Sequence, residues 1–453
     1  MLHVIISGAG IAGLAAAVSL RRAGHIVDIY ERSAMNNEVG AAINVPPNAS
    51  RFLQAWGLDP KEWRFVTARL QTFNDPKSLK PFIINDLSAA QTADTAKLYL
   101  AHRVDLHNAL KWMATRPDGP GEPVRIHLQS EVVAYDPDAP SMTLRSGEVI
   151  HGDLIIGADG VHSVACETVL QRKNKPIKPM HANFCYRFLI PTADIEADPE
   201  TRFYNENCEG GTRVIPHSDG KRRVVSYMCR ENTIHNFVGL FSDDDMEAGT
   251  EDWQASVDIS EVLKRFSDFN PDLLKVMAKA SEAKQWPLLY RSPLETWHRG
   301  YMALAGDSAH PMLPHQGQGG AQGMEDGLAL GIIMSGATSK EEAKERFKIY
   351  QQVRHSRVSV IQVLSNVGQD QLNEIRHEAA RYMPEDRIPS NQQEVRQFNF
   401  HFDIVDASIR AMRQYDPSFE LPSDFFDRPV AGVPNSDTLQ RKTSNLVANA
   451  AKI

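Results

Sequence analysis

The sequence has little of what marks several common classes of protein. Its 453 residues include only four cysteines, and no two of them stand in a C-x-x-C pair, so neither a disulfide framework nor a thiolate metal site is predicted. No histidine falls in an H-E-x-x-H pattern, and we expect no metal. No apolar run is long enough to span a membrane. The net charge of −8 argues against nucleic acid or an anionic membrane as the main partner.

What is present is the composition of an ordinary globular protein, with 42% hydrophobic and 23% charged residues. The length predicts two or more lobes. The first predicted strand begins at residue 2, which leaves no room for a signal peptide, so we expect a cytoplasmic protein that is a monomer or a homodimer. In a reducing compartment the four thiols are expected to be free and buried: Cys166, Cys185, Cys208 and Cys229.

A glycine-rich turn near the N-terminus organises the chain. Residues 2–6 are mostly large and apolar, as in a buried parallel strand, and residues 14–23 are largely Ala and Leu, as in a helix. Gly8, Gly10 and Gly13 lie between them with the spacing G-x-G-x-x-G. They permit, in order, a tight turn, close approach of a pyrophosphate, and close packing of helix on strand. Because the helix N-terminus also offers unpaired N–H groups, the pattern predicts a dinucleotide site.

An acidic residue ends the next predicted strand, residues 26–30. Glu31 lies 18 residues after Gly13 and can accept both hydroxyls of an adenosine ribose. Its charge would repel a 2′-phosphate, which favours FAD or NAD over NADP at this site. A βαβ unit that binds nothing would need strand, glycines, helix and acid all to be placed by chance.

Two later buried strands also run into acidic turns. Residues 153–156 lead into Gly157-Ala158-Asp159-Gly160, and residues 301–305 lead into Gly306-Asp307. A carboxylate at the carboxyl end of a strand in an α/β sheet is well placed to face a ligand. Asp159 could equally cap the helix that starts at Ser163, and both roles can hold together.

A glycine-rich loop follows Asp307, over residues 312–323, and a helix is predicted over residues 324–334. The helix N-terminus would direct N–H groups and partial positive charge at whatever the loop binds. A flexible linker is the alternative, but linkers are rarely set between a buried strand and an Ala/Leu helix.

Two arginines stand in places that call for an anion. Arg103 lies near the start of a predicted helix, residues 103–114, where a cation is unfavourable by dipole alone; a solvated arginine is the alternative. Arg187 interrupts the apolar strand of residues 184–190, where a charge is costly to bury alone. An internal salt bridge and a substrate carboxylate or phenolate remain alternatives for Arg187.

The rest of the chain changes character twice. Residues 175–285 are rich in predicted strands, including 201–204, with one helix over 259–280, which indicates a separate sheet-rich lobe. A capping box at Ser339 starts a helix to about residue 370, and helices are predicted over 376–383 and 393–412.

Together these stretches resemble the single-component, FAD-dependent aromatic monooxygenases. Their fold is that of p-hydroxybenzoate hydroxylase, and the likeness is greatest to salicylate hydroxylase and its fungal relatives. Three motifs carry the resemblance: the glycine fingerprint with Glu31, residues 157–160, and Gly306-Asp307 with its glycine-rich loop. They are spread in the family's order over some three hundred residues, and the likeness covers about residues 1–370.

The resemblance implies an α/β (α+β two-lobed) fold, with a Rossmann-like FAD-binding domain, a sheet-rich substrate domain and a C-terminal helical region. The expected boundaries are 1–174 and 286–370 for the two parts of the FAD-binding domain, 175–285 for the substrate domain, 371–426 for the C-terminal helices and 427–453 for a disordered tail.

The resemblance also implies which residues bind FAD. Gly8, Gly10 and Gly13 hold the pyrophosphate and Glu31 holds the ribose. The remaining cofactor positions that the family implies are Ala42 and Asn44 beside the flavin, Arg103 on the cofactor, Asp307 on the ribityl chain, Gly320 and Ala321 with N–H groups toward the isoalloxazine, and Asp159 in a motif linked with both FAD and NAD(P)H.

The implied reaction is hydroxylation of an aromatic ring. NAD(P)H visits, reduces the flavin and leaves, and the reduced flavin reacts with O₂ to give a C4a-hydroperoxide that transfers oxygen to an electron-rich ring. His315 is expected to hydrogen-bond the phenol or carboxylate, as a base or an orienting group, because its turn faces the flavin in the family. Arg187 resembles by position an arginine that contacts substrate in some relatives. The residues expected to line the ring are Tyr186, Tyr227, Met228 and Pro314.

One position departs from the family. The motif usually continues G-A-D-G-x-x-S-x-x-R, and Cys166 stands here in place of the arginine. The first hypothesis is hydroxylation of a phenolic acid, with or without decarboxylation, as in salicylate hydroxylase. The second is oxidation of a fungal secondary metabolite of polyketide or indole type. A third, supported only by Cys166, is a flavin-binding interaction protein without turnover.

Overall fold

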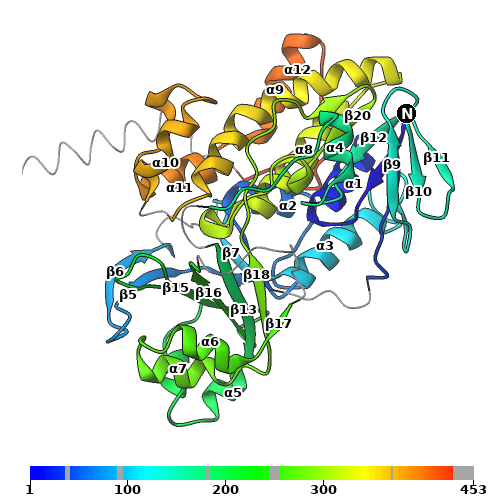
Figure 1. Cartoon of the computed structure of the whole chain (residues 1–453). Helices are drawn as coiled ribbons and strands as arrows, with labels where there is room; N and C mark the ends of the chain where they lie inside the picture. The colour runs from blue at the N-terminus through cyan, green and yellow to red at the C-terminus, as the bar shows by residue number, and fades with distance from the viewer. Residues whose placement is uncertain (36–40, 89–94, 180–182, 244–254, 369–370, 432–453) are drawn as a thin grey trace, which may run out of the picture.

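The computed structural model describes residues 1–35, 41–88, 95–179, 183–243, 255–368 and 371–431, arranged as two lobes (Figure 1). A six-stranded sheet, parallel except for one edge strand, forms the centre of the first lobe. Its strands in spatial order are β19 (His298–Arg299), β20 (Met302–Leu304), β12 (Leu154–Gly157), β1 (His3–Ser7), β2 (Ile26–Tyr30) and β8 (Arg125–His127).

The register of this sheet brings three motifs to one edge. Ser7 lies opposite Gly157, and Gly157 lies opposite Leu304. The turns that follow β1, β12 and β20 therefore meet at the carboxyl ends of the strands, where open α/β sheets bind ligands. The three motifs, which lie far apart in the sequence, therefore stand at the same edge of one sheet.

Two helices pack closely beside the sheet, α1 (Ile11–Arg22) and α8 (Gly319–Met334). Glycines in α8 allow the two helices to pack against each other. A Cβ at Gly327 would lie 2.4 Å from the Ala16 nitrogen, and a Cβ at Gly331 would lie 2.0 Å from Ser19 Oγ. The prediction that this helix begins at residue 324 was wrong: the glycines taken for a loop form its first turn. Glycine has low helix propensity, so its packing role was hidden from the sequence.

The second lobe is built on an eight-stranded sheet whose far face is covered by short helices (Figure 1). Its strands in spatial order are β17 (Ser256–Val257), β18 (Ala283–Pro287), β13 (Phe184–Pro191), β16 (Ile234–Phe241), β15 (Arg223–Cys229), β14 (Gly211–Pro216), β5 (Leu70–Asn74) and β6 (Pro81–Asp86). The sheet thus draws on residues 70–86, which the assignment of 1–174 to the FAD-binding domain did not foresee.

Two local predictions in this lobe were wrong, and one strand was missed. Arg202–Asn205 forms a 3₁₀ helix instead of a strand, and β16 was not predicted. The single helix expected over 259–280 is two helices, α6 (Ile259–Arg265) and α7 (Pro271–Met277), because Asn270 caps a new helix whose first residue is a proline. A third helix, α5 (Thr192–Glu196), covers the same sheet together with α6 and α7.

Smaller elements complete the first lobe. They are α2 (Pro47–Ala55), α3 (Arg103–Thr115), α4 (Val164–Leu170), a sheet of β3 (Ala42–Val45), β7 (Tyr99–His102) and β4 (Val66–Thr67), and a sheet of β9 (Val132–Asp136), β10 (Ser141–Leu144) and β11 (Val149–His151). Pro46 occupies the N-cap position of α2, and Asn48 lies inside this helix with its side chain buried.

The C-terminal region is helical. Ser339 caps α9 (Lys340–Leu364), as the capping box predicted, and α10 (Leu372–Ala379) follows. The single helix expected over 393–412 is α11 (Gln392–Phe400) and α12 (Ile404–Tyr415), because Asp403 caps a second start. The tail was expected from Asp427, but that residue is held by Arg22 (2.9 Å) and Arg116 (3.1 Å). Residues 432–453 lie outside the described residues.

Candidate active site

A cavity of about 810 Å³ is walled by both lobes. One part lies at the carboxyl ends of β1 and β12, and the other lies against the eight-stranded sheet. Of the seventeen predicted site residues, thirteen line it: Gly8, Gly10, Glu31, Ala42, Asn44, Arg103, Asp159, Arg187, Tyr227, Asp307, Pro314, His315 and Gly320. Gly13, Ala321, Tyr186 and Met228 do not.

The three glycines of the fingerprint differ in what surrounds them. A Cβ at Gly8, which has φ +97°, would lie 2.3 Å from the Ala158 carbonyl oxygen, and one at Gly13 would lie 2.0 Å from the Gly8 carbonyl oxygen. A Cβ at Gly10 would meet no heavy atom within 4 Å, and Gly10 lines the cavity. Gly8 and Gly13 therefore shape the turn, whereas Gly10 leaves open a cradle that a side chain would fill.

Glu31 ends β2 at the same edge of the cavity. Its two carboxylate oxygens accept the backbone N–H groups of Ala9 and Ser33, both at 2.8 Å. Each oxygen keeps a further lone pair, so the fixed carboxylate can still accept ribose hydroxyls.

Asp159 is a junction between turns as well as a cavity residue. Its carboxylate accepts from Ser163 Oγ (2.5 Å) and the Ala165 N–H (3.0 Å) at the start of α4, which confirms the capping role. It also accepts from Ser308 Oγ (3.0 Å) and Tyr135 Oη (3.1 Å). Asp159 therefore ties the turn after β12 to the turn after β20.

Asp307 projects into the cavity from that second turn. The carboxyl is exposed to the cavity, but the surrounding protein shields it from bulk water, and this burial raises its pKa. His310, Arg103 and Arg291 oppose the shift. Arg103 begins α3 and lines the cavity, so it presents a cation at the place where the sequence predicted one.

The first turn of α8 forms another wall. The first backbone hydrogen bond of α8 runs from the Gln322 N–H to the Gln318 carbonyl (2.8 Å). The N–H groups of residues 319–321 therefore precede the first intrahelical hydrogen bond. Gly320 packs so closely on Ile43 that a Cβ would lie 2.8 Å from its Cδ1. Asn44 also lines the cavity, and its buried Oδ1 has no hydrogen-bond partner within the described residues.

The eight-stranded sheet presents alternate residues to the cavity. On β15, Tyr227 lines the cavity, while Met228 points to the opposite face, where Thr192 Oγ1 contacts its sulfur (4.0 Å). On β13, Arg187 lines the cavity, while Tyr186 is buried in the core beneath α6 and α7. The structure therefore does not bring Tyr186 and Met228 to the cavity, because neighbours in a strand face opposite sides.

Arg187 lies against an aromatic ring. Its guanidinium is 4.3 Å from the ring centroid of Trp286, and its Nε has no hydrogen-bond partner within the described residues.

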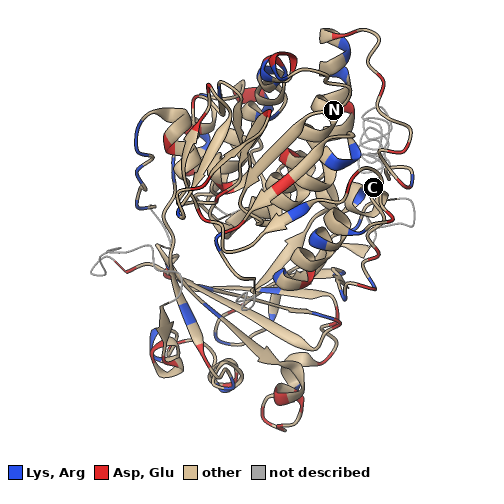
Figure 2. Cartoon of the chain, turned by 90° about the vertical axis from the view of Figure 1, so that its right-hand side faces the viewer, with Lys and Arg blue, Asp and Glu red and all other residues tan. Residues whose placement is uncertain are grey.

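Tyr227 presents a hydroxyl group on the same sheet. Burial raises the pKa of this hydroxyl, which therefore stays protonated and able to donate a hydrogen bond. In Figure 2 most of the length of the strands in this sheet is tan, so few of their residues are Lys, Arg, Asp or Glu.

Several cavity residues were not predicted. Those on the sheet are Gln71, Phe73, Thr212, Val214, Arg223, Val225, Val238, Leu240 and Trp286. A period-two pattern identifies which residues share a face, but the pairing of β14 with β5 depends on a register that local sequence does not reveal.

Among the described residues, no helix is long and apolar enough to cross a membrane, and no three His, Cys, Asp or Glu side chains are grouped to hold a metal. The four cysteines are free and buried, as predicted.

Known proteins match this arrangement. The family model described as "FAD binding domain" matches residues 1–363. The chain belongs to this family. It is 51% identical over 429 residues to the FAD-dependent monooxygenase cfoG of Aspergillus candidus, covering 94% of this chain and 99% of the relative. It is 31% identical over 369 residues to the hispidin-3-hydroxylase of Neonothopanus nambi, covering 80% and 86%.

Solved structures agree on the fold. CtdE in complex with FAD and a substrate matches with a TM-score of 0.76 at 20% identity, over 91% of this chain and 98% of that one. A salicylate hydroxylase substrate complex matches with a TM-score of 0.66, also at 20% identity, over 96% and 99%. The protein is thus an FAD-dependent monooxygenase of the aromatic hydroxylase type, as the resemblance implied.

Proposed function

We propose that this protein uses NAD(P)H and O₂ to hydroxylate a phenolic substrate that carries an anionic group. One oxygen atom would enter the ring, replacing hydrogen or a carboxyl lost as CO₂. The other would leave as water, with two electrons supplied by NAD(P)H. The observation that carries the proposal is the single cavity that joins the dinucleotide cradle to the polar face of the eight-stranded sheet.

The cavity residues fit FAD. Gly10 leaves space for a pyrophosphate, Glu31 is fixed as an acceptor for ribose hydroxyls, and Asn44 Oδ1 is a buried acceptor that a flavin N–H can satisfy. The other cofactor positions would be Gly8, Arg103, Asp159, Asp307 and Gly320, which line the cavity, and Gly13 and Ala321, which support it. Bound FAD supplies the hydride acceptor and the site of oxygen activation.

The substrate would lie between the flavin and the sheet. Arg187 would bind its anionic group, since its guanidinium is oriented by Trp286. Tyr227 would donate a hydrogen bond to a ring oxygen, and His315 would orient the phenol or take its proton. Pro314 would pack on the ring. Apolar wall residues such as Val238 and Leu240 would exclude water.

Cys166 stands where the family motif usually has an arginine. The Cys166 side chain is buried, and burial raises its pKa to about 11, so it is a neutral thiol. It donates no positive charge to a nicotinamide cofactor. We expect that NAD(P)H is recognised elsewhere.

The deciding experiment is oxidation of NADH and NADPH by the FAD-loaded protein, with and without salicylate, followed by product mass. Stimulated oxidation with formation of catechol supports the phenolic-acid proposal. Oxidation with no dependence on any phenol tested contradicts it and favours an interaction protein without turnover.

A second candidate is oxidation of a larger fungal secondary metabolite. It is supported by the relatives, since the hispidin-3-hydroxylase is 31% identical and the salicylate hydroxylase only 20%. A phenolic panel that includes hispidin separates the candidates, because simple hydroxylation adds one oxygen to the product mass while decarboxylating hydroxylation lowers it.

A further inference from the structure

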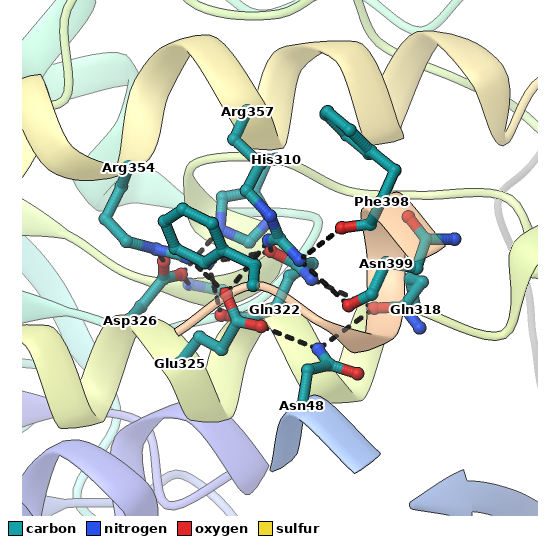
Figure 3. Close-up of polar contacts among 12 residues, drawn as sticks. Asn48, His310, Gln318, Gln322, Glu325, Asp326, Arg354, Arg357, Phe398 and Asn399 are labelled. Carbon is teal, nitrogen blue, oxygen red and sulfur yellow. Dashed lines mark hydrogen bonds and ion pairs between the residues drawn. The ribbon is translucent and has the colours of Figure 1, made fainter. Parts of the chain in front are cut away.

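A buried polar network lies directly behind the first turn of α8 (Figure 3). It joins α2, the turn after β20, α8 and α9, and every one of its side chains is buried: Asn48, His310, Gln318, Gln322, Glu325, Asp326, Arg354 and Arg357. Two acids face two arginines, so the fixed charges compensate one another. Such a network is costly unless its members are satisfied, which makes any unsatisfied atom informative.

The arginines determine which way the amide of Gln322 points. Arg354 Nη2 and Arg357 Nη1 lie 2.8 and 2.9 Å from Gln322 Oε1. A guanidinium has donors only, so the atom that faces it must be the oxygen. Gln322 Nε2 is thereby left to donate, and it does so to Gln318 Oε1 at 2.9 Å.

The hydrogen bonds of Glu325 also determine which way the amide of Gln318 points. Glu325 Oε2 pairs with Arg357 (3.0 Å), and its Oε1 accepts from Asn48 Nδ2 (2.6 Å). The same Asn48 nitrogen donates to Gln318 Oε1 at 3.2 Å. Two chains of hydrogen bonds, one through Gln322 and one through Glu325 and Asn48, thus identify the inward atom of Gln318 as its oxygen.

Gln318 supplies the one unsatisfied atom among the described residues of this network whose residue lines the cavity. Three further atoms have no hydrogen-bond partner within the described residues, but their residues do not line the cavity: Asn48 Oδ1, His310 Nδ1 and Arg357 Nε. Gln318 is 1% exposed and lines the cavity, and its Nε2 has no hydrogen-bond partner within the described part of the chain. A buried amide N–H without an acceptor is rare in folded proteins, and it is expected where a ligand supplies the acceptor. The neighbours of Gln318 are Gly317, Gly319 and Gly320, which also line the cavity.

We propose that Gln318 Nε2 donates a hydrogen bond to an acceptor on the pyrimidine edge of the flavin, and that the network fixes this polarity. The inference rests on the proposed binding of FAD. Asn44 Oδ1, an acceptor on the same cavity, complements it, since that edge of a flavin carries both acceptors and an N–H. Arg357 also donates to the carbonyls of Phe398 (3.3 Å) and Asn399 (2.9 Å), so the end of α11 is anchored to the same network.

Two substitutions test the proposal. Gln318→Met keeps the size of the side chain and removes the donor, and FAD affinity should fall about tenfold. Gln318→Glu keeps an oxygen for Asn48 and Gln322 but turns an acceptor toward the flavin, so affinity should fall further and the flavin reduction potential should become more negative. Gln352→Met, at an exposed position of α9, is the matched control and should leave both unchanged.

The readouts are the FAD dissociation constant from flavin fluorescence, the visible spectrum and the reduction potential. Thermal unfolding of each apo variant separates a folding defect from a lost contact. If Gln318→Met does not fold, Gln318→Glu decides, because it retains the inward hydrogen bonds. Wild-type affinity, spectrum and potential in a folded variant would overturn the inference alone, whereas failure of the wild-type chain to bind FAD would overturn the proposed function.

Discussion

The dinucleotide cradle and the face of the eight-stranded sheet build one cavity in different ways. In the cradle, contacts between backbone atoms decide the shape, as where Gly13 leaves no room for a Cβ beside the Gly8 carbonyl. On the sheet, side chains decide it, as where Arg187 faces the cavity and its neighbour Tyr186 the core. The cradle is therefore intolerant of added atoms, whereas the sheet is sensitive to which side chain stands at each alternate position.

The largest effect is expected from adding a methyl group in the cradle. Gly13→Ala would place a Cβ 2.0 Å from a carbonyl oxygen, so it should both lower the unfolding temperature of the apo protein and abolish FAD binding. Gly10→Ala meets nothing in the apo protein and should leave that temperature unchanged, while FAD affinity falls about 10- to 100-fold. Calorimetry and fluorescence titration of the pair measure both effects. Normal FAD binding by Gly10→Ala would show that no pyrophosphate approaches there.

Removing a charge from the sheet should affect substrate and spare the cofactor. Arg187→Met would remove the cation that stacks on Trp286, and KM for an anionic phenol should rise about 10- to 100-fold. The FAD dissociation constant should not change. Arg187→Lys keeps the positive charge but lacks the planar guanidinium group, so its KM should lie between those of the wild type and Arg187→Met. An equal loss of FAD affinity in Arg187→Met would refute the division of the cavity into two regions.

This difference between the regions explains what the sequence could predict. Gly8, Glu31 and Asp159 were predicted as site residues because each stands in a short motif at the end of a buried strand, and all three line the cavity. The pairing of β14 with β5 joins segments about 140 residues apart, and no local pattern encodes it. The start of α8 was missed because glycines that permit close packing look like a loop.

The direction of individual side chains was the other feature that the sequence could not predict. Tyr186 and Tyr227 looked equivalent in the sequence, since each lies inside a predicted strand, but of the two only Tyr227 reaches the cavity. Gln318 lay inside a recognised loop, yet its amide direction depends on Arg354 and Arg357, which belong to a distant helix.

A smaller effect is expected from removing one hydroxyl. Tyr227→Phe would lose a hydrogen-bond donor to the substrate, and kcat/KM should fall about fivefold. Tyr186→Phe is the matched control on the opposite face and should keep the wild-type value. If both variants lost the same activity, the assignment of opposite faces to the two tyrosines would have no functional meaning.

The smallest effect concerns the apo cradle itself. Folding raises the pKa of Asp307, so the native state holds this proton more tightly than the unfolded state does. The free energy of unfolding is then unaffected below the unfolded pKa and decreases as the pH rises through the folded pKa. Asp307→Asn removes that decrease, so apo Asp307→Asn should unfold at a slightly higher temperature than the apo wild type near neutral pH, and the two should converge near pH 3.

The same substitution should act in the opposite direction on the cofactor. If the Asp307 carboxyl is kept to bind the ribityl chain, Asp307→Asn weakens FAD binding while it stabilises the apo protein. Asp424→Asn, at an exposed position, should do neither. An unfolding temperature for Asp307→Asn that equals the wild type at every pH would mean that the carboxyl costs the fold nothing. The cradle would then be sensitive to added atoms alone and not to charge.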